Sequence, residues 1–493
     1  MRASGVLLPI ASLPSKYGIG AFSRSAYEFV DFLAEAGQKY WQILPLGPTG
    51  YGDSPYQSFS SYAGNPYFIN LDELVSQGWL TTAECESYDF GDNQRYVDYE
   101  KVYQSRFKVL KTAFLCSNII ENGAYQQFAA ENQDWLYDYA LYMAVKNHFE
   151  GASWTEWEED IRNRESQAVE QYRQELVEDV GFYCFLQYEF YRQWGNLKRY
   201  ANERGVDIVG DIPIYVAFDS ADTWANPELF QFDEQHQPLA VAGCPPDYFS
   251  ATGQLWGNPL YDWSYHKQTD YAWWIRRMEH SFQIYDVVRV DHFRGFDEYY
   301  AIPYGNETAE KGIWKAGPGL EFFEKVKARL GNLRIVAEDL GYLTESVLAL
   351  VKETGYPGMK VLGFAFDSDT SNAYLPHNHH TNCIVYTGTH DNQTINGWYE
   401  DVSEGCKQFI AAYVGLPVEQ ATANECFIRL ALASVAKTAI IPIQDWLGLG
   451  IEARINEPST LGENWHWRLY KEELNADLIG RMRDMTGLYG RLR

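Results

Sequence analysis

Carboxylate side chains stand at the ends of several short apolar runs in this 493-residue sequence. Such runs end near Asp211, Asp291, Glu338, Asp391 and Asp445. A carboxylate in an apolar strand is costly to bury unless it is paired or functional, so the set indicates a shared site. Two carboxyl groups about 5–5.5 Å apart would suit retaining glycoside chemistry through a covalent glycosyl-enzyme. For any single one of them, an Asp that caps the following helix is the competing interpretation.

The residues around these carboxylates favour different roles for each. Arg289 and Asp291 are two residues apart, so in a strand both side chains point to the same side. A guanidinium beside a carboxylate keeps it ionised and oriented, which suits a nucleophile, although a structural ion pair is the alternative. Glu338 holds the matching position one strand on, as a general acid would. Asp391 follows His390 and could bind sugar hydroxyls and stabilise positive charge at the reacting carbon.

Eight short apolar, β-branched runs must position these residues. Their near-continuous apolar character is typical of parallel strands buried on both faces, and they cover 4–10, 40–46, 206–216, 286–293, 333–340, 360–366, 383–390 and 439–445. Helical patterns lie between the runs, at 25–37, 271–285, 320–330, 344–354 and 424–438. The alternation of strand and helix predicts an α/β fold, a (β/α)8 TIM barrel, with its active residues at the carboxyl ends of the strands.

The chain is longer than the roughly 250 residues of a typical barrel, so it must carry insertions. We interpret residues 1–493 as a single catalytic barrel domain with two large insertions. Residues 47–205, after the second strand, are expected to form a mainly helical subdomain, with helices at about 100–121, 132–149 and 167–204. Residues 217–268, after the third strand, are rich in Pro, Gly and aromatic residues with weak periodicity, and we expect a substrate-binding loop region there.

Aromatic residues make up 16% of the chain, and Tyr and Trp among them carry a polar atom that needs a partner. Some of them gather in residues 243–263, which hold Tyr248, Phe249, Trp256, Tyr261 and Trp263 beside Asp247, Gln254 and Asn258. A sugar ring presents C–H faces that pack on aromatic rings and hydroxyls that need polar partners. The cluster therefore favours a carbohydrate-binding loop, although aromatics that fill a local core are the alternative.

Composition narrows the partners further. Lys and Arg number 40 and Asp and Glu 67, a net charge of −27, which argues against nucleic acid and anionic membrane surfaces as partners. No stretch of about 18 apolar residues occurs, so no membrane span is expected. The seven cysteines form no CxxC pair, which indicates a cytoplasmic protein with reduced thiols and no zinc site. No dinucleotide or phosphate-loop motif is present, and we expect neither a metal ion nor a cofactor.

The candidate residues follow the order Asp211, Arg289-x-Asp291-His292, Glu338 and His390-Asp391. This order resembles that of the α-amylase superfamily of retaining barrels. Further segments resemble the 4-α-glucanotransferase family, glycoside hydrolase family 77. They are Leu8-Pro9-Ile10, Leu13-Pro14-Ser15, Tyr17-Gly18-Ile19-Gly20, Trp41-Gln42-Ile43-Leu44-Pro45-Leu46, Ser54-Pro55-Tyr56, Pro245-Pro246-Asp247-Tyr248-Phe249 and Gly253-Gln254-Leu255-Trp256-Gly257-Asn258-Pro259. The likeness covers essentially the whole chain, without a departure at the expected catalytic positions.

The resemblance implies transfer of a 1,4-α-D-glucan segment to the 4-OH of an acceptor glucan or glucose, by a retaining double displacement with a covalent intermediate. Donors and acceptors would be maltooligosaccharides and other α-1,4-glucans. Asp291 would be the nucleophile, Glu338 the acid/base and Asp391 the transition-state stabiliser. Residues expected to bind substrate are Arg289, His292, His390, Asp211, Tyr56, Asp247, Trp256 and Asn464, the last of which could equally cap the barrel.

Two alternatives to a transferase stay open at this point. An α-amylase-like hydrolase would use the same carboxylates but pass the glucan to water. A non-catalytic glucan-binding protein on a barrel scaffold would be expected to lack one of the three carboxylates, whereas all three are present.

Overall fold

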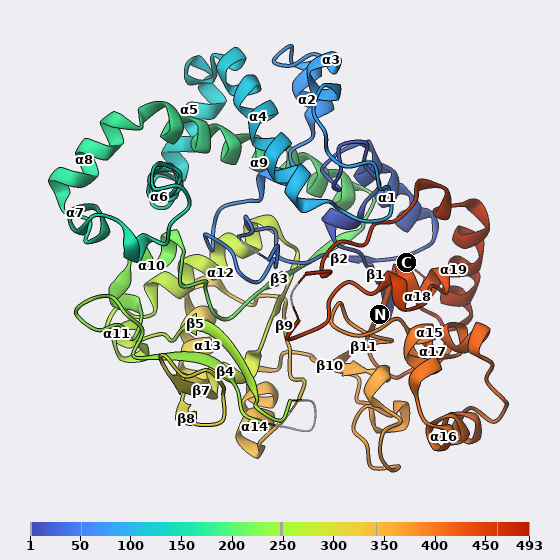
Figure 1. Ribbon diagram of the computed structural model, residues 1–493. Helices are drawn as coiled ribbons and strands as arrows, with labels where there is room; N and C mark the ends of the chain where they lie inside the picture. The colour runs from blue at the N-terminus through green and yellow to red at the C-terminus, as the bar shows by residue number, and fades with distance from the viewer. Residues whose placement is uncertain (1, 51, 247–249, 342, 461, 493) are drawn as a thin grey trace.

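Eight parallel strands form the centre of the computed structural model, which describes residues 2–50, 52–246, 250–341, 343–460 and 462–492 (Figure 1). They are hydrogen-bonded in the order β10-β11-β12-β1-β2-β3-β6-β9. Their bounds are β1 (Ala3–Leu7), β2 (Tyr40–Gln42), β3 (Asp207–Ile212), β6 (Val287–Val290), β9 (Ile335–Ala337), β10 (Gly358–Val361), β11 (Cys383–Tyr386) and β12 (Thr438–Pro442). Each predicted run overlaps one strand, so the predicted barrel is confirmed.

The barrel closes between its two terminal strands, β9 and β10, without a regular ladder. The Ala337 N–H donates to the Pro357 carbonyl at 3.0 Å. One residue beyond the catalytic candidate Glu338, the carboxylate of Asp339 accepts the N–H of Met359 at 2.6 Å. A side-chain acceptor thus takes the place of a strand carbonyl at this seam.

Helices surround the barrel strands. The five predicted ones are confirmed as α1 (Arg24–Glu35), α12 (Ala272–Ile284), α13 (Gly319–Leu330), α14 (Glu345–Thr354) and α17 (Ala423–Ala433). Helices that the sequence did not predict follow β11 and β12, namely α15 (Ile395–Asp401), α16 (Glu404–Val414), α18 (Ile443–Leu447) and α19 (Ala476–Leu488). In α1 the buried residues include Ala26, Phe29, Val30 and Leu33, and this three-and-four spacing turns one apolar stripe toward the strands.

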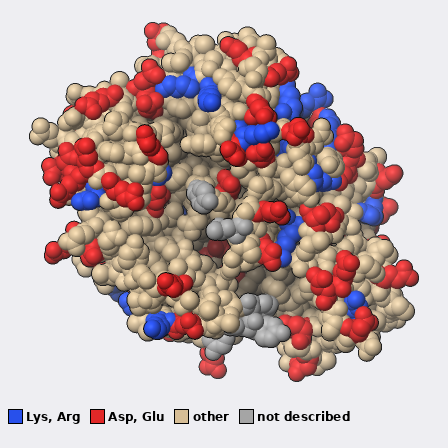
Figure 2. Space-filling model, in the orientation of Figure 1, with Lys and Arg blue, Asp and Glu red and all other residues tan. Residues whose placement is uncertain are grey.

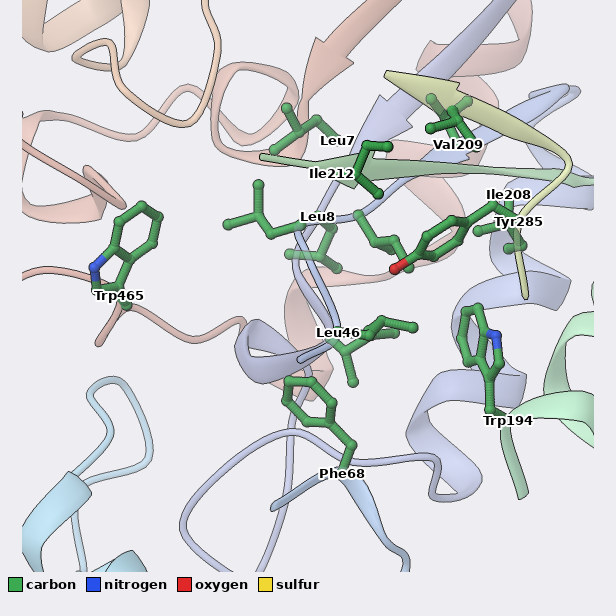
Figure 3. Close-up of a cluster of buried hydrophobic side chains, with 14 of the residues drawn as sticks. Leu7, Leu8, Leu46, Phe68, Trp194, Ile208, Val209, Ile212, Tyr285 and Trp465 are labelled. Atoms are coloured by element: carbon green, nitrogen blue, oxygen red, sulfur yellow. The ribbon is translucent and has the colours of Figure 1, made fainter. Parts of the chain in front are cut away.

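Residues between β2 and β3 form α2 (Leu71–Ser76), α3 (Thr82–Glu86), α4 (Tyr99–Ser117), α5 (Gly123–Glu131), α6 (Leu136–His148), α7 (Glu159–Arg162), α8 (Ser166–Glu175) and α9 (Val177–Glu203). The helix predicted for 167–204 is two helices, because the chain leaves helical geometry at Leu176 (φ −106°, ψ 25°). Helix α9 returns the chain to the barrel, where the Trp194 indole donates to the Ile284 carbonyl at 3.0 Å. Figure 3 shows Trp194 near the buried side chains of the strands.

A second, antiparallel sheet lies beside the barrel, in the order β5-β4-β7-β8 (Figure 1). Its strands are β4 (Ala240–Cys244), β5 (Gln254–Pro259), β7 (Glu298–Pro303) and β8 (Ile313–Ala316). The stretch 217–268, expected as an inserted loop region, contains β4 and β5 together with the short helices α10 (Ala221–Ala225) and α11 (Trp263–Gln268). Strand β4 reads Ala-Val-Ala-Gly-Cys, which has weak strand preference by itself, and it is stabilised by pairing with β7, which lies far along the chain.

No helix in the described ranges is both long enough and apolar enough to cross a membrane.

Candidate active site

The carboxyl ends of the barrel strands bring the candidate residues together. Arg289 lies in β6, Asp211 lies near the end of β3, and the segments just after β6, β9 and β11 carry Asp291, Glu338 and Asp391. Parallel strands of a barrel end at the same mouth, so residues far apart in sequence meet there. Figure 2 shows the face of the molecule hollowed near its middle, with acidic side chains inside the hollow, and in the same orientation Figure 1 places barrel strands there.

A buried guanidinium connects two of the carboxylates. Arg289 is only 3% exposed, and its Nη1 lies 2.7 Å from both carboxylate oxygens of Asp211. Its Nη2 lies 2.9 Å from Oδ1 of Asp291. Burial lowers the pKa of Arg289, but the carboxylates of Asp211 and Asp291 raise this pKa well above its ordinary value. Arg289 therefore stays charged and fixes the orientation of the Asp291 carboxylate.

The two aspartates paired with Arg289 differ in access. The Asp211 side chain is fully buried, whereas the Asp291 side chain is 28% exposed. The Asp291 N–H donates to the Ile212 carbonyl at 2.9 Å, which continues the β3–β6 pairing and fixes its backbone. Of this pair, Asp291 is the carboxylate that a substrate could reach.

Glu338 is held by two backbone N–H groups. His292 N–H donates to Oε2 and Leu340 N–H donates to Oε1, each at 2.8 Å. Burial raises the pKa of Glu338 to about 7, with repulsion from Asp291 adding to the rise and Arg289 opposing it. A carboxyl group with this pKa can both give and take a proton near neutral pH.

Asp391 has the opposite electrostatic character. Asn456 Nδ2 donates to its Oδ1 at 2.6 Å, and His390 Nε2 lies 3.2 Å from its Oδ2. Burial raises the pKa of Asp391, but the nearby His390 and the hydrogen bond from Asn456 lower it to about 2. Carboxyl groups whose pKa values are pushed apart take different roles in acid–base chemistry, and here Asp391 stays ionised while Glu338 can carry a proton.

Tyr56, which lies after β2, connects two of the site residues. Its hydroxyl donates to Asp211 Oδ2 at 2.8 Å and lies 2.8 Å from His390 Nε2. Its ring stacks on the His390 ring with centroids 5.3 Å apart. Burial lowers the pKa of His390, but Asp391 beside it raises the pKa above its ordinary value overall.

His292, the residue after Asp291, packs against the ring of Trp256. His292 has a left-handed backbone (φ 48°), which turns the chain sharply after β6. The edge of its ring meets the Trp256 ring from β5, with centroids 4.7 Å apart. Burial lowers the pKa of His292 to about 4, so the imidazole is neutral at neutral pH. Within the described part of the chain, the buried Nε2 of His292 has no hydrogen-bond partner.

Two predicted substrate-binding residues are not brought to this cluster by the described structure. Asp247 lies outside the described residues. Asn464 accepts the Glu457 N–H at 2.9 Å and donates to the Thr460 carbonyl at 3.0 Å, so its amide bonds its own loop, and its contact with substrate stays a prediction. Asn456 is the asparagine that meets Asp391. Asn456 follows the last barrel strand, and nothing in the spacing of the sequence connects it with Asp391.

No group of three or more His, Cys, Asp or Glu among the described residues is arranged to hold a metal ion.

A (β/α)8 barrel whose mouth holds an accessible aspartate, a protonatable glutamate and an ionised aspartate is typical of enzymes that cleave or transfer glycosidic bonds. A family model described as 4-alpha-glucanotransferase matches residues 8–473. The chain therefore belongs to the 4-alpha-glucanotransferase family, and it is an enzyme acting on α-1,4-glucans. The hydrolase and non-catalytic alternatives are not favoured.

Individual relatives agree with this assignment along their whole length. The 4-alpha-glucanotransferase of Clostridium butyricum is 50% identical over 484 residues, which cover 98% of this chain and 99% of the relative. That of Streptococcus pneumoniae is 48% identical over 496 residues, which cover 100% of this chain and 98% of the relative. The solved amylomaltase of Streptococcus agalactiae, in complex with acarbose, has a TM-score of 0.97 and 44% identity, with 100% of both chains covered.

Proposed function

We propose that Asp291, Glu338 and Asp391 carry out the glucan transfer as nucleophile, acid/base and transition-state stabiliser. The observation that carries this proposal is the different environment of each carboxylate in one mouth. Asp291 is accessible and oriented by Arg289, Glu338 has a pKa of about 7, and Asp391 has a pKa of about 2. These are the properties that a retaining double displacement requires.

In the first half-reaction, a carboxylate oxygen of Asp291 attacks the anomeric carbon of the donor glucan. The bond from that carbon to the bridging oxygen breaks, and Glu338 gives its proton to this oxygen, which leaves as the 4-OH of the released glucan. A glycosyl ester on Asp291 remains. A pKa of about 7 leaves a substantial fraction of Glu338 protonated for this step at neutral pH.

In the second half-reaction, the acceptor 4-OH gives its proton to the Glu338 carboxylate and its oxygen attacks the anomeric carbon. The ester bond breaks, and Asp291 is regenerated as a carboxylate. Positive charge develops at the anomeric carbon in both transition states. The ionised carboxylate of Asp391 stabilises this charge, because its low pKa keeps it unprotonated at neutral pH.

The remaining residues would bind the sugar nearest the reacting bond. Tyr56 donates to the Asp211 carboxylate, and His390 lies beside the Asp391 carboxylate. The unpartnered Nε2 of His292 is available to a sugar hydroxyl. Trp256 places an aromatic ring beside His292, on which a pyranose face can pack. The S. agalactiae amylomaltase is solved with acarbose bound, which supports an oligosaccharide in the corresponding mouth of this chain.

Maltooligosaccharides and other α-1,4-glucans would serve as both donor and acceptor. Residues 47–205, as a helical subdomain, and 217–268, as a substrate-binding region, would border the mouth and reduce the access of water to the glycosyl ester. We place the reaction in the cytoplasm, because the cysteines of the chain are all free.

Incubation with maltotriose tests the proposal. The wild-type enzyme should form glucose and longer oligosaccharides without a net gain of reducing ends, because each bond broken is replaced by another. Asp291→Asn should lower the transfer rate by about 10⁴-fold or more. Asp286→Asn is a matched control, since Asp286 lies just before the opposite end of the same strand and pairs with Lys198.

The outcomes separate the parts of the proposal. Transfer that persists in Asp291→Asn would exclude Asp291 as the nucleophile. Reducing ends that increase in step with product formation in the wild-type enzyme would show that water, not a glucan, is the main acceptor. Loss of activity in Asp286→Asn as well would mean that the Asp291 result reflects folding.

A further inference from the structure

The segment that carries His390 and Asp391 is tied at both ends to one buried carboxylate. Asp445, in α18, accepts the hydroxyl of Thr387 at 2.5 Å on one oxygen. It accepts the N–H of Ile395 at 2.8 Å on the other. Thr387 directly follows β11, and Ile395 is the first residue of α15, so these two bonds enclose the whole segment between strand and helix.

We propose that Asp445 is a positioning residue for the transfer reaction, because it fixes both ends of the 387–395 segment and thereby holds Asp391 in its place at the mouth. Among the described residues, the Asp445 side chain forms no hydrogen bond or ion pair with Asp211, Arg289, Asp291, Glu338 or Asp391. Its side chain is fully engaged by Thr387 and Ile395. Its influence on the reaction therefore passes through the segment. This inference rests on the proposed role of Asp391.

The middle of the same segment is held from the chain that follows α18. Asn456 Nδ2 donates to the Asp391 carboxylate at 2.6 Å, and its backbone N–H donates to the His390 carbonyl at 3.1 Å. Arg454 Nη2 donates to the Asp391 carbonyl at 3.1 Å. Residues 443–456 therefore hydrogen-bond the 387–395 segment at both ends through Asp445 and at its centre through Arg454 and Asn456.

Asp445 is itself held firmly by its neighbours. Asn424 of α17 donates to the Asp445 carbonyl at 2.7 Å. Asn396 of α15 accepts the Asn424 N–H at 3.0 Å and donates to the Gly448 carbonyl at 3.0 Å. Figure 1 shows α15, α17 and α18 side by side at the orange and red part of the chain. A residue tied to three packed helices is a suitable fixed point for a catalytic loop.

The Asp445 carboxylate uses both of its oxygens to hold the segment. Asp445 is 1% exposed, and two donors point at it, one at each oxygen. An amide of the same size could still accept the Ile395 N–H through its oxygen and donate its NH2 group to the Thr387 oxygen, because a hydroxyl accepts as well as donates. Burial raises the pKa of Asp445 to about 6, and the two hydrogen bonds oppose this rise.

Substitution of Thr387 tests the inference with the least disturbance. Thr387→Val keeps the shape but removes the hydroxyl, and Thr387→Ser restores the hydroxyl. We expect Thr387→Val to lower kcat for maltotriose transfer about ten- to hundredfold with little change in KM, because a displaced catalytic group loses rate rather than binding. Thr387→Ser should stay within about threefold of the wild-type kcat.

Thr486→Val is the matched control for loss of a buried hydroxyl. Thr486, in α19, is fully buried and accepts a hydrogen bond from Gln38 at 3.0 Å, and neither residue contacts the site. Thr486→Val should lower the thermal midpoint about as much as Thr387→Val does while leaving kcat unchanged. Equal losses of kcat in the two valine variants would overturn the inference, since they would show a general effect of stability.

Asp391→Asn separates this inference from the proposed function. If Asp391→Asn is inactive and folded Thr387→Val keeps its kcat within about twofold, Asp445 does not position the segment for catalysis. If Asp391→Asn retains transfer, the proposed role of Asp391 fails, whatever Thr387→Val shows. Loss of kcat in Thr387→Val, its recovery in Thr387→Ser and an inactive Asp391→Asn together would support both.

Discussion

Replacement of Glu338 by Gln should remove activity and at the same time change how the stability of the protein depends on pH. The Glu338 side chain is half-buried, and loss of solvation raises its pKa from 4.5 to about 7. Below about pH 4.5 both the folded and the unfolded chain keep this proton. Between about pH 4.5 and 7 the unfolded chain releases it while the folded chain holds it, so this group makes the folded state less stable as pH rises.

The size of the effect follows from the pKa difference. At about 1.4 kcal/mol per pKa unit, a rise from 4.5 to about 7 corresponds to about 3 kcal/mol of stability lost across this pH range. Unfolding entropy of about 2.1 cal/mol/K per residue gives about 1 kcal/mol/K for 493 residues. The thermal midpoint of the wild-type protein should therefore fall by about 3 °C relative to Glu338→Gln between about pH 4.5 and 8.

Scanning calorimetry of the two proteins over this pH range measures the difference directly. Titrating groups that do not interact with Glu338, including Asp445, are present in both proteins and cancel in the comparison. Gln has only one acceptor for the N–H groups of His292 and Leu340, so the variant carries a stability loss of about 1–3 kcal/mol that does not vary with pH. Only the pH-dependent part of the midpoint difference reports on the Glu338 pKa.

A midpoint difference that stays constant within about 0.5 °C from pH 4.5 to 8 would refute the reasoning. It would mean that the folded and unfolded chains hold this proton equally, so that Glu338 is not a general acid poised near neutral pH. A difference that grows in the opposite direction would mean that the folded state favours the ionised carboxylate, as expected for a structural ion pair with Arg289.

Two further substitutions test the support around Asp291. Arg289→Lys should lower kcat at least about tenfold, because a single ammonium group cannot bond both Asp211 and Asp291 as the guanidinium does. Circular dichroism checks that the variant is folded. An unchanged kcat would contradict the role of Arg289. Tyr56→Phe should lower kcat/KM by about tenfold, because the hydroxyl that joins Asp211 and His390 is lost. Steady-state maltotriose kinetics measures this, and a value equal to that of the wild type would exclude a role for the hydroxyl.

Much of the barrel could be predicted because its signal is local. A strand buried on both faces needs a continuous apolar run, as in Val287–Val290, and a helix that covers it needs an apolar stripe, as in α1. The residues after such runs then fall at one mouth by the geometry of a parallel barrel. For this reason the meeting of Asp211, Arg289, Asp291, Glu338 and Asp391 at one mouth could be predicted from their positions in the chain.

Elements without such a local signal were missed. Strands β4, β5, β7 and β8 are stabilised by pairing with one another across a long stretch of sequence, and the Ala and Gly in β4 gave no strand pattern. Asn456 and Asp445 were visible as polar residues near the last strand, but their partners, Asp391 and Thr387, lie more than fifty residues away. Nothing in the spacing could connect them.

The sequence by itself determined which chemical groups stand at the mouth, because strand periodicity and family resemblance place each carboxylate at a strand end. Only the tertiary structure decided how those groups differ. Burial raises the pKa of Glu338 to about 7 against the opposing charge of Arg289, while His390 and Asn456 bring that of Asp391 to about 2. A pKa depends on the desolvation and charges that surround a group in space, and residues distant in sequence supply both.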